Sequence, residues 1–182
     1  MTILYESPRT VFSMATLNIM TGEQKAGVLA KKLNYYVRGG RLLNPHRGFY
    51  AKKGYNPEEL ACQLYPPCYL SLEYVLQRAG VVFQYDSSIA AVSYLSRSVT
   101  VDGREFRYRR IKGEIFADGD GIKHYNGISI ATPERAFLDT LYLCSSYHFD
   151  NLRPLDCKKV KEILPSYGCK RMEERVRELF GK

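Results

Sequence analysis

The sequence predicts an α+β protein in which a small unit of helices and one hairpin, residues 1–57, precedes a mixed α/β domain, residues 58–182. Charge divides the chain in the same place: residues 1–57 carry nine Lys and Arg and two acidic residues, a net +7, whereas the rest carries +1. Residues 81–130 are rich in Val, Ile, Tyr and Phe, which predicts a largely antiparallel sheet. Amphipathic segments after residue 132 predict C-terminal helices.

Capping residues predict the elements at the N-terminus. Ser7-Pro8 predicts a helix over residues 8–12, because a capping side chain precedes proline at the first helical position. Ser13 is expected to cap a second short helix, which Gly22 ends in a turn. A longer helix is expected over residues 23–38. Its apolar residues recur at steps of three and four and predict one buried stripe: Ala26, Leu29, Leu33, Tyr36 and Val37.

A β-hairpin is expected next, over residues 41–52. Two short apolar runs flank the turn-rich centre Asn44-Pro45-His46-Arg47-Gly48. Asn56-Pro57 then begins a helix over residues 57–64, and the domain boundary is placed here because the excess of positive charge also ends here.

The second domain is expected to begin with a rigid connector at residues 65–67 and a helix over 72–79 capped by Ser71. Strands are expected over residues 81–85, 89–94, 97–101, 104–111, 114–117, 121–125 and 127–130. Asp102-Gly103 suits the type I′ turn of a hairpin. Helices are expected over residues 133–144, 156–164 and 169–180.

Helix, turn, helix and hairpin with a basic third helix are typical of a winged helix-turn-helix. The major groove of a DNA duplex admits one α-helix, and phosphates flank it. We therefore expect Lys31 and Lys32 to contact phosphates, and Gln24, Lys25 and Val28 to face base edges. The expected DNA-contacting residues are Gln24, Lys25, Val28, Lys31, Lys32, Tyr35, Arg41, His46 and Arg47.

Composition favours a globular cytoplasmic protein without a cofactor or metal. Hydrophobic residues make up 45% of the chain and charged residues 25%. No apolar run approaches the roughly 20 residues that span a bilayer, and the N-terminus has no signal-peptide pattern. The five cysteines are odd in number, without C-x-x-C spacing, and the three histidines do not stand at zinc-ligand spacing from them.

An enzyme is not expected. Asp102, Glu105 and the Asp118-Gly119-Asp120 loop could be imagined as the metal-binding acids of a nuclease. However, Asp102 is explained by a hairpin turn, and the lysine that usually follows the second acid is missing. Glu134 follows Thr132-Pro133 and is explained by favourable charge at a helix N-terminus.

Three stretches give the sequence a resemblance to a known family. They are Arg47-Gly48-Phe49-Tyr50-Ala51, the segment 65–76 (YPPCYLSLEYVL), and the segment 130–139 (IATPERAFLD) with Leu141-Tyr142-Leu143 after it. In order and separation the sequence resembles the AbiEi-type antitoxins, transcriptional regulators of bacterial abortive-infection toxin–antitoxin pairs. It departs from the family at Tyr74, where a small residue is frequent, and at Ala79, where a histidine is frequent. These departures are expected to alter packing or partner contacts.

The resemblance implies a repressor that binds double-stranded DNA at repeats in the promoter of its own operon. It also implies that the C-terminal domain supports antitoxicity, without a stable complex with a nucleotidyltransferase-like toxin.

One alternative stays open at this point. The basic winged helix could dock an acidic protein, and the 15 tyrosines could serve such an interface. Competition by duplex DNA separates the two interpretations.

Overall fold

The computed structural model describes residues 2–23 and 25–181. Its helices are α1 (Thr2–Glu6), α2 (Met14–Thr21), α3 (Ala26–Arg38), α4 (Pro57–Leu64), α5 (Glu73–Arg78), α6 (Gly113–Ala117), α7 (Pro133–Leu143), α8 (Cys157–Ile163), the 3-10 helix η1 (Leu164–Tyr167) and α9 (Lys170–Phe180). Its strands are β1 (Val11–Ser13), β2 (Leu43–His46), β3 (Phe49–Ala51), β4 (Cys68–Leu70), β5 (Ile89–Ser93), β6 (Arg97–Val101), β7 (Arg104–Arg110), β8 (Ile122–Tyr125) and β9 (Ile128–Ala131).

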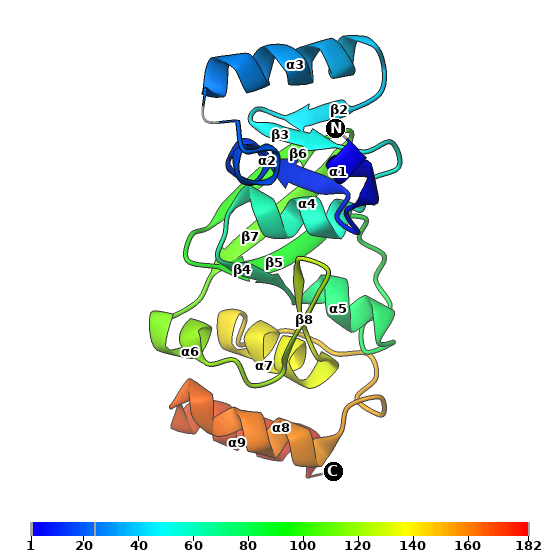
Figure 1. The fold of residues 1–182 in the computed structure, drawn as a ribbon. Coiled ribbons are helices and arrows are strands. Elements are labelled where there is room, and N and C mark those ends of the chain that lie inside the picture. Colours follow the sequence, from blue (N-terminus) through cyan, green and yellow to red (C-terminus); the bar gives the residue numbers. More distant parts are fainter. Residues whose placement is uncertain (1, 24, 182) are drawn as a thin grey trace.

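These elements form layers along one direction of the molecule (Figure 1). Helix α3 is the outermost layer at one end, above a small sheet of order β1-β3-β2. Helix α4 lies between this sheet and a larger one of order β6-β7-β5-β4-β9-β8, whose other side is covered by α5 and α7. Helices α8 and α9 close the opposite end, so the basic helix α3 and the C-terminal helices lie far apart.

The larger sheet is mixed. Strand pairs β6/β7, β5/β4 and β9/β8 are antiparallel, whereas β5/β7 and β4/β9 are parallel. The first parallel pair arises because β6 forms the edge and β7 returns between β6 and β5. The second arises because β9 lies beside β4, although many residues separate the two strands in the sequence. The α+β class and the C-terminal helices are confirmed, and the sheet has more parallel pairing than the sequence indicated.

Near the N-terminus the sequence predicted α2 correctly and one helix wrongly. The Ser13 hydroxyl accepts the backbone N–H of Thr16 at 3.1 Å, and Gly22 ends α2 with a left-handed φ of 66°. The helix expected over residues 8–12 is absent from the described residues; α1 ends before it, and β1 begins at Val11. The physical reason is that Ser7 accepts the N–H of Arg9 in a turn instead of capping a helix.

The small sheet joins two hydrophobic cores. Val11 and Phe12 of β1 pair with Ala51 and Tyr50 of β3. Val11 and Ala51 belong to the main core, whereas Phe12 and Tyr50 belong to a smaller core shared with α2 and α3. Alternation along a strand sends neighbouring side chains to opposite faces, so β1 and β3 contribute to a core on each side of the sheet, whereas β2 is partly exposed at its edge.

Helix α4 ties the small sheet to the large one. The Asn56 side chain caps it, as the sequence predicted, by accepting the N–H of Glu58 at 2.9 Å. The buried carboxylate of Glu59 accepts both the N–H (2.8 Å) and the hydroxyl (2.6 Å) of Thr10, just before β1. On the other side, the Tyr108 hydroxyl of β7 donates to the carbonyl of Ala61 at 2.8 Å.

In the second domain four expectations are wrong. Strand β4 was not predicted, because it spans only Cys68–Leu70 and follows directly on two prolines, so its apolar run is too short to show a period. Residues 81–85 form no strand, and residues 114–117 belong to helix α6. Ser71 does not cap α5: Leu72 stands at the N-cap position with φ 59°, and the Ser71 hydroxyl donates to Asp139 at 2.8 Å.

Other expectations in this domain are confirmed. Strands β5, β6, β7, β8 and β9 and helices α7, α8 and α9 lie where the sequence placed them, within a few residues. Asp102 and Gly103 have φ values of 49° and 76°, the left-handed pair that a type I′ turn requires. The Thr132 side chain caps α7 by accepting the N–H of Arg135.

An ion pair lies at the centre of the second domain. The Arg135 side chain is fully buried, and its Nε donates to the Asp139 carboxylate at 3.2 Å, one helical turn away. Its terminal nitrogens donate to the backbone carbonyls of Ile115, Asp118 and Asp120. All five guanidinium N–H groups thus have acceptors close by, counting the Tyr69 hydroxyl as well.

We predict that Asp139→Asn lowers the free energy of unfolding by about 3 kcal/mol or more, because it leaves a buried guanidinium without its counter-charge. Chemical denaturation of the full chain measures the loss. Glu105→Gln is the matched control, since Glu105 forms a half-exposed ion pair with Arg107 at 3.7 Å; it should cost under about 1 kcal/mol. Equal losses in the two variants would contradict the structural role of the buried pair.

Candidate nucleic-acid interface

Helix α3 has one buried and one exposed face. Leu29 and Leu33 are buried against Leu17 of α2 and Leu42, which precedes β2. The opposite face carries exposed side chains at steps of three and four residues: Val28, Lys31, Tyr35 and Arg38. This spacing places them along one stripe of the helix.

The exposed stripe faces away from the rest of the protein. Figure 1 shows α3 as the outermost layer, with the β2–β3 hairpin directly beneath it. Tyr35 is 69% exposed and Val28 39% exposed, although both have large apolar surfaces. An outermost, cationic helix with exposed apolar groups has the chemistry of an element that inserts into a groove.

The N-terminal end of α3 differs from the expectation. The helix begins at Ala26 and not at residue 23. Lys25 occupies the N-cap position and is exposed, and its side chain makes no capping hydrogen bond. Glu23 bends back instead, so that its carboxylate accepts the N–H of Lys25 at 3.4 Å. Gln24, expected to face base edges, lies outside the described residues.

Lys32 is the one predicted phosphate contact that already has an acidic partner. Its Nζ lies 3.3 Å from the Glu23 carboxylate, with the two side chains 59% and 24% exposed. Lys31 and Lys32 line the same hollow in the surface, together with Leu29 and Tyr36. The pairing with Glu23 is therefore what makes Lys32 less well placed for a phosphate than Lys31.

One side chain adds to the backbone pairing of the β2–β3 hairpin. The Asn44 amide donates to the carbonyls of His46 (3.1 Å) and Phe49 (2.6 Å) across the turn. Gly48 has a φ of 82°, which only glycine adopts without strain. Arg47, between them, is exposed at the tip.

His46 does not project from the hairpin as expected. It is half-buried, and its ring packs against Phe49 with 5.9 Å between ring centroids. Its Nδ1 is buried without a hydrogen-bond partner among the described residues. The side chain is thus placed to support the hairpin, and a contact with DNA would require it to turn outward.

Two other cations have contacts within the fold. The Arg41 guanidinium lies 5.9 Å from the centre of the Tyr36 ring, and the Arg41 carbonyl accepts the hydroxyl of Tyr5 at 2.8 Å. Lys52 donates to the carbonyls of Tyr5 and Ser7, which fixes α1 against the sheet. Arg41 stays exposed and available, whereas Lys52 does not.

Arg38 was not among the residues predicted to contact DNA. It is exposed in the last turn of α3 and continues the stripe of Val28, Lys31 and Tyr35. Arg38 lies seven residues, or about two helical turns, after Lys31, and this spacing predicts that both residues lie on the same face of the helix. Lys31, Arg38 and Arg47 form no ion pair within residues 2–23 and 25–181.

Other types of site find little support in the described part of the chain. No three His, Cys, Asp or Glu side chains there are grouped so that they could hold a metal ion. None of the helices described has the length and apolar character needed to cross a membrane. In comparisons with known proteins, no family model and no curated protein matches the chain.

We predict that Asn44→Ala loosens the hairpin, because two carbonyls lose their shared donor. Amide hydrogen exchange in residues 43–51 should accelerate, and stability should fall by about 1 kcal/mol. Asn34→Ala, on the exposed side of α3, is the control and should leave the hairpin protected. Unchanged exchange in the Asn44 variant would show that the turn is held by its backbone alone.

Proposed function

We propose that this chain is a sequence-specific DNA-binding transcriptional regulator whose first 57 residues act as a winged helix-turn-helix. The observation that carries the proposal is the outward stripe of α3, where Lys31 and Arg38 have no acidic partner among the described residues. The exposed Arg47 at the tip of the neighbouring hairpin adds a third such cation. Cations left without partners on an exposed helix favour a polyanionic ligand.

The order and pairing of the elements support the same proposal. A winged helix runs helix, strand, helix, helix, strand, strand, with the first strand paired to the last. The chain has α1, β1, α2, α3, β2 and β3 in that order, and β1 pairs with β3. The turn between α2 and α3 begins with Gly22, as is common in helix-turn-helix units.

In this proposal α3 lies in the major groove and the β2–β3 hairpin is the wing. Val28 and Tyr35 face base edges, where an apolar group can contact the methyl group of thymine. Lys31 and Arg38 contact phosphates on either side of the groove, and Arg47 contacts a phosphate or a narrow minor groove. Lys25, at the N-cap of the helix, stays a candidate for a base contact, and so does Gln24, which lies outside the described residues.

The biological role rests on the resemblance to AbiEi-type antitoxins. On that basis the chain represses its own operon by binding repeats in the promoter, and it counteracts a nucleotidyltransferase-like toxin without a stable complex. It would act in the cytoplasm and catalyse no reaction itself. Binding of an acidic protein by α3 is the alternative, and the first experiment below separates it from DNA binding.

We predict that the full chain binds the duplex immediately upstream of its own coding sequence more tightly than a scrambled duplex. Lys31→Ala or Arg38→Ala should weaken both duplexes alike and reduce the slope of log affinity against log salt by about 0.9, because one phosphate contact releases its counterions. Fluorescence anisotropy over a salt series measures both quantities. Lys123→Ala, an exposed lysine of β8, is the control of equal charge.

Equal affinity of the two duplexes would contradict sequence-specific binding, and an unchanged slope in the α3 variants would contradict the placement of α3 in the groove. If an acidic protein pulled down by the chain stays bound in excess duplex DNA, the alternative holds instead.

We further predict that Glu23→Gln strengthens binding to any duplex by about twofold to fivefold, the worth of one surface charge interaction. The substitution releases Lys32 from its ion pair and removes a negative charge beside the phosphates. Glu6→Gln, an exposed acid of α1, should change affinity less. Anisotropy with the scrambled duplex measures this directly, and weaker binding by Glu23→Gln would show that the ion pair is needed to position α3.

A further inference from the structure

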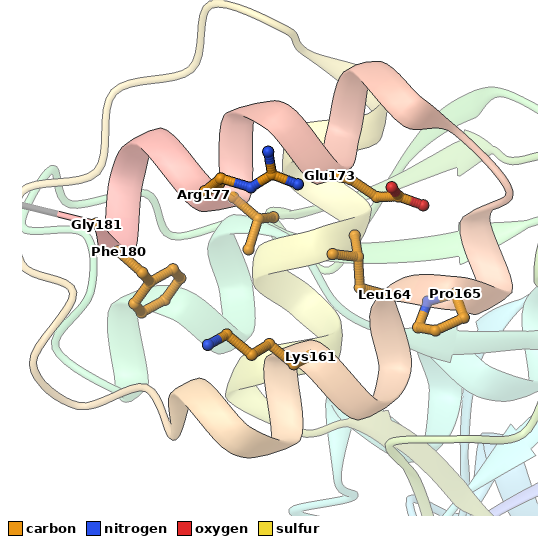
Figure 2. Close-up of a pocket in the computed structure, with 8 residues that line it drawn as sticks. Lys161, Leu164, Pro165, Glu173, Arg177, Phe180 and Gly181 are labelled. Carbon is orange, nitrogen blue, oxygen red and sulfur yellow. The ribbon is translucent and has the colours of Figure 1, made fainter.

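A groove lies between the C-terminal helices, at the end of the molecule opposite α3 (Figure 1). Helix α8 with η1 forms one wall and α9 the other (Figure 2). Its volume is about 370 Å³. Pockets for small organic ligands begin at about 300 Å³, so the groove has room for a small molecule.

The floor of the groove is apolar. Val176 is buried, and Leu164 and Phe180 are half-buried and turn their remaining surface toward the groove. The same Phe180 ring packs edge-on against Phe137 of α7, at 5.7 Å between centroids. This contact holds the ring in place, so it forms a fixed wall.

The rim is cationic. Lys161 extends from α8, and Arg177 extends from α9 above the floor (Figure 2). Among residues 2–23 and 25–181 neither side chain forms an ion pair, although Glu173 stands one helical turn before Arg177. Glu173 lies at one end of the groove, so the lining residues within the described part of the chain carry a net charge of +1.

We propose that this groove binds a small amphipathic monocarboxylate, with its apolar chain on Leu164, Val176 and Phe180 and its carboxylate between Lys161 and Arg177. The planar guanidinium fork matches a carboxylate, and hydrogen bonds between charged groups are the stronger ones. A single negative charge balances the rim, whereas Glu173 would repel a second. The inference does not depend on DNA binding, because α3 lies at the other end of the fold.

The experiment uses the full chain, labelled with ¹⁵N and ¹³C, in NMR titrations with sodium octanoate, octan-1-ol and octylammonium. Octanoate should shift the signals of Leu164, Val176 and Phe180 and bind about tenfold more tightly than octylammonium, because only the carboxylate pairs with the rim. Octan-1-ol should bind at the same place with intermediate affinity.

Matched variants locate the carboxylate. Arg177→Gln and Lys161→Gln should each weaken octanoate by about fivefold or more and leave octan-1-ol nearly unchanged. Arg171→Gln on α9 and Lys158→Gln on α8 remove the same charge from exposed positions outside the groove. They should change octanoate affinity by less than about twofold, the effect of a distant surface charge.

Three results would overturn the proposal. They are shifts that map elsewhere or do not appear, equal affinity for octanoate and octylammonium, and equal weakening by the groove and control variants. None of these results bears on the DNA proposal, whose readout is binding to a duplex.

Discussion

The buried pair of Arg135 and Asp139 is the interaction that joins the larger sheet to the helices around it. Burial raises the pKa of the Asp139 carboxyl, and the charge of Arg135 and the hydroxyls of Tyr167, Ser71 and Tyr69 oppose that shift. Such a pair is costly to desolvate and is tolerated only when nearly every donor and acceptor is satisfied. Here the donors and acceptors come from α7, β4, η1 and the segment 115–120, so satisfying the pair fixes four parts of the chain relative to one another.

The need to supply acceptors to the Arg135 guanidinium also explains the glycine at position 121. Gly121 has a φ of 76°, and a Cβ atom there would lie 2.8 Å from Cβ of Arg135 and 2.9 Å from the Ile163 side chain. The backbone at residues 118–121 must approach α7 this closely so that its carbonyls reach the guanidinium. A residue with a side chain would hold the loop away and leave donors of a buried cation unpaired. The C-terminal helices pack on this arrangement, through Tyr167, whose hydroxyl donates to Asp139 at 2.6 Å.

The sequence predicted most of the elements with local signals and failed where tertiary contacts decided. Ser13, Asn56 and Thr132 cap helices through their own side chains, and Asp102-Gly103 forms its turn from its own backbone preference, so short windows were enough. Ser71 has the same capping chemistry, but its hydroxyl is taken by Asp139, 68 residues away. Strand β1 is another such case: Val11 and Phe12 become strand because each completes a different core.

In the candidate site, too, features set by local sequence were predicted and features set by tertiary contacts were not. Helical spacing correctly put Lys31, Tyr35 and Val28 on the exposed face of α3, because the buried stripe is set by the sequence itself. The half-buried ring of His46 and the pairing of Lys32 with Glu23 depend on how the turn and hairpin fold back, which periodicity does not contain. The cationic side chains fall into two groups, those that already have acceptors or acidic partners within the fold and those that do not. Arg135 and Lys52 donate to acceptors within the fold, whereas Lys31 and Arg38 of α3 form no ion pair within residues 2–23 and 25–181. Exposed cations without an ion pair also occur elsewhere on the surface, so it is their alignment along one outward stripe of α3 on which the proposal of a polyanionic ligand rests.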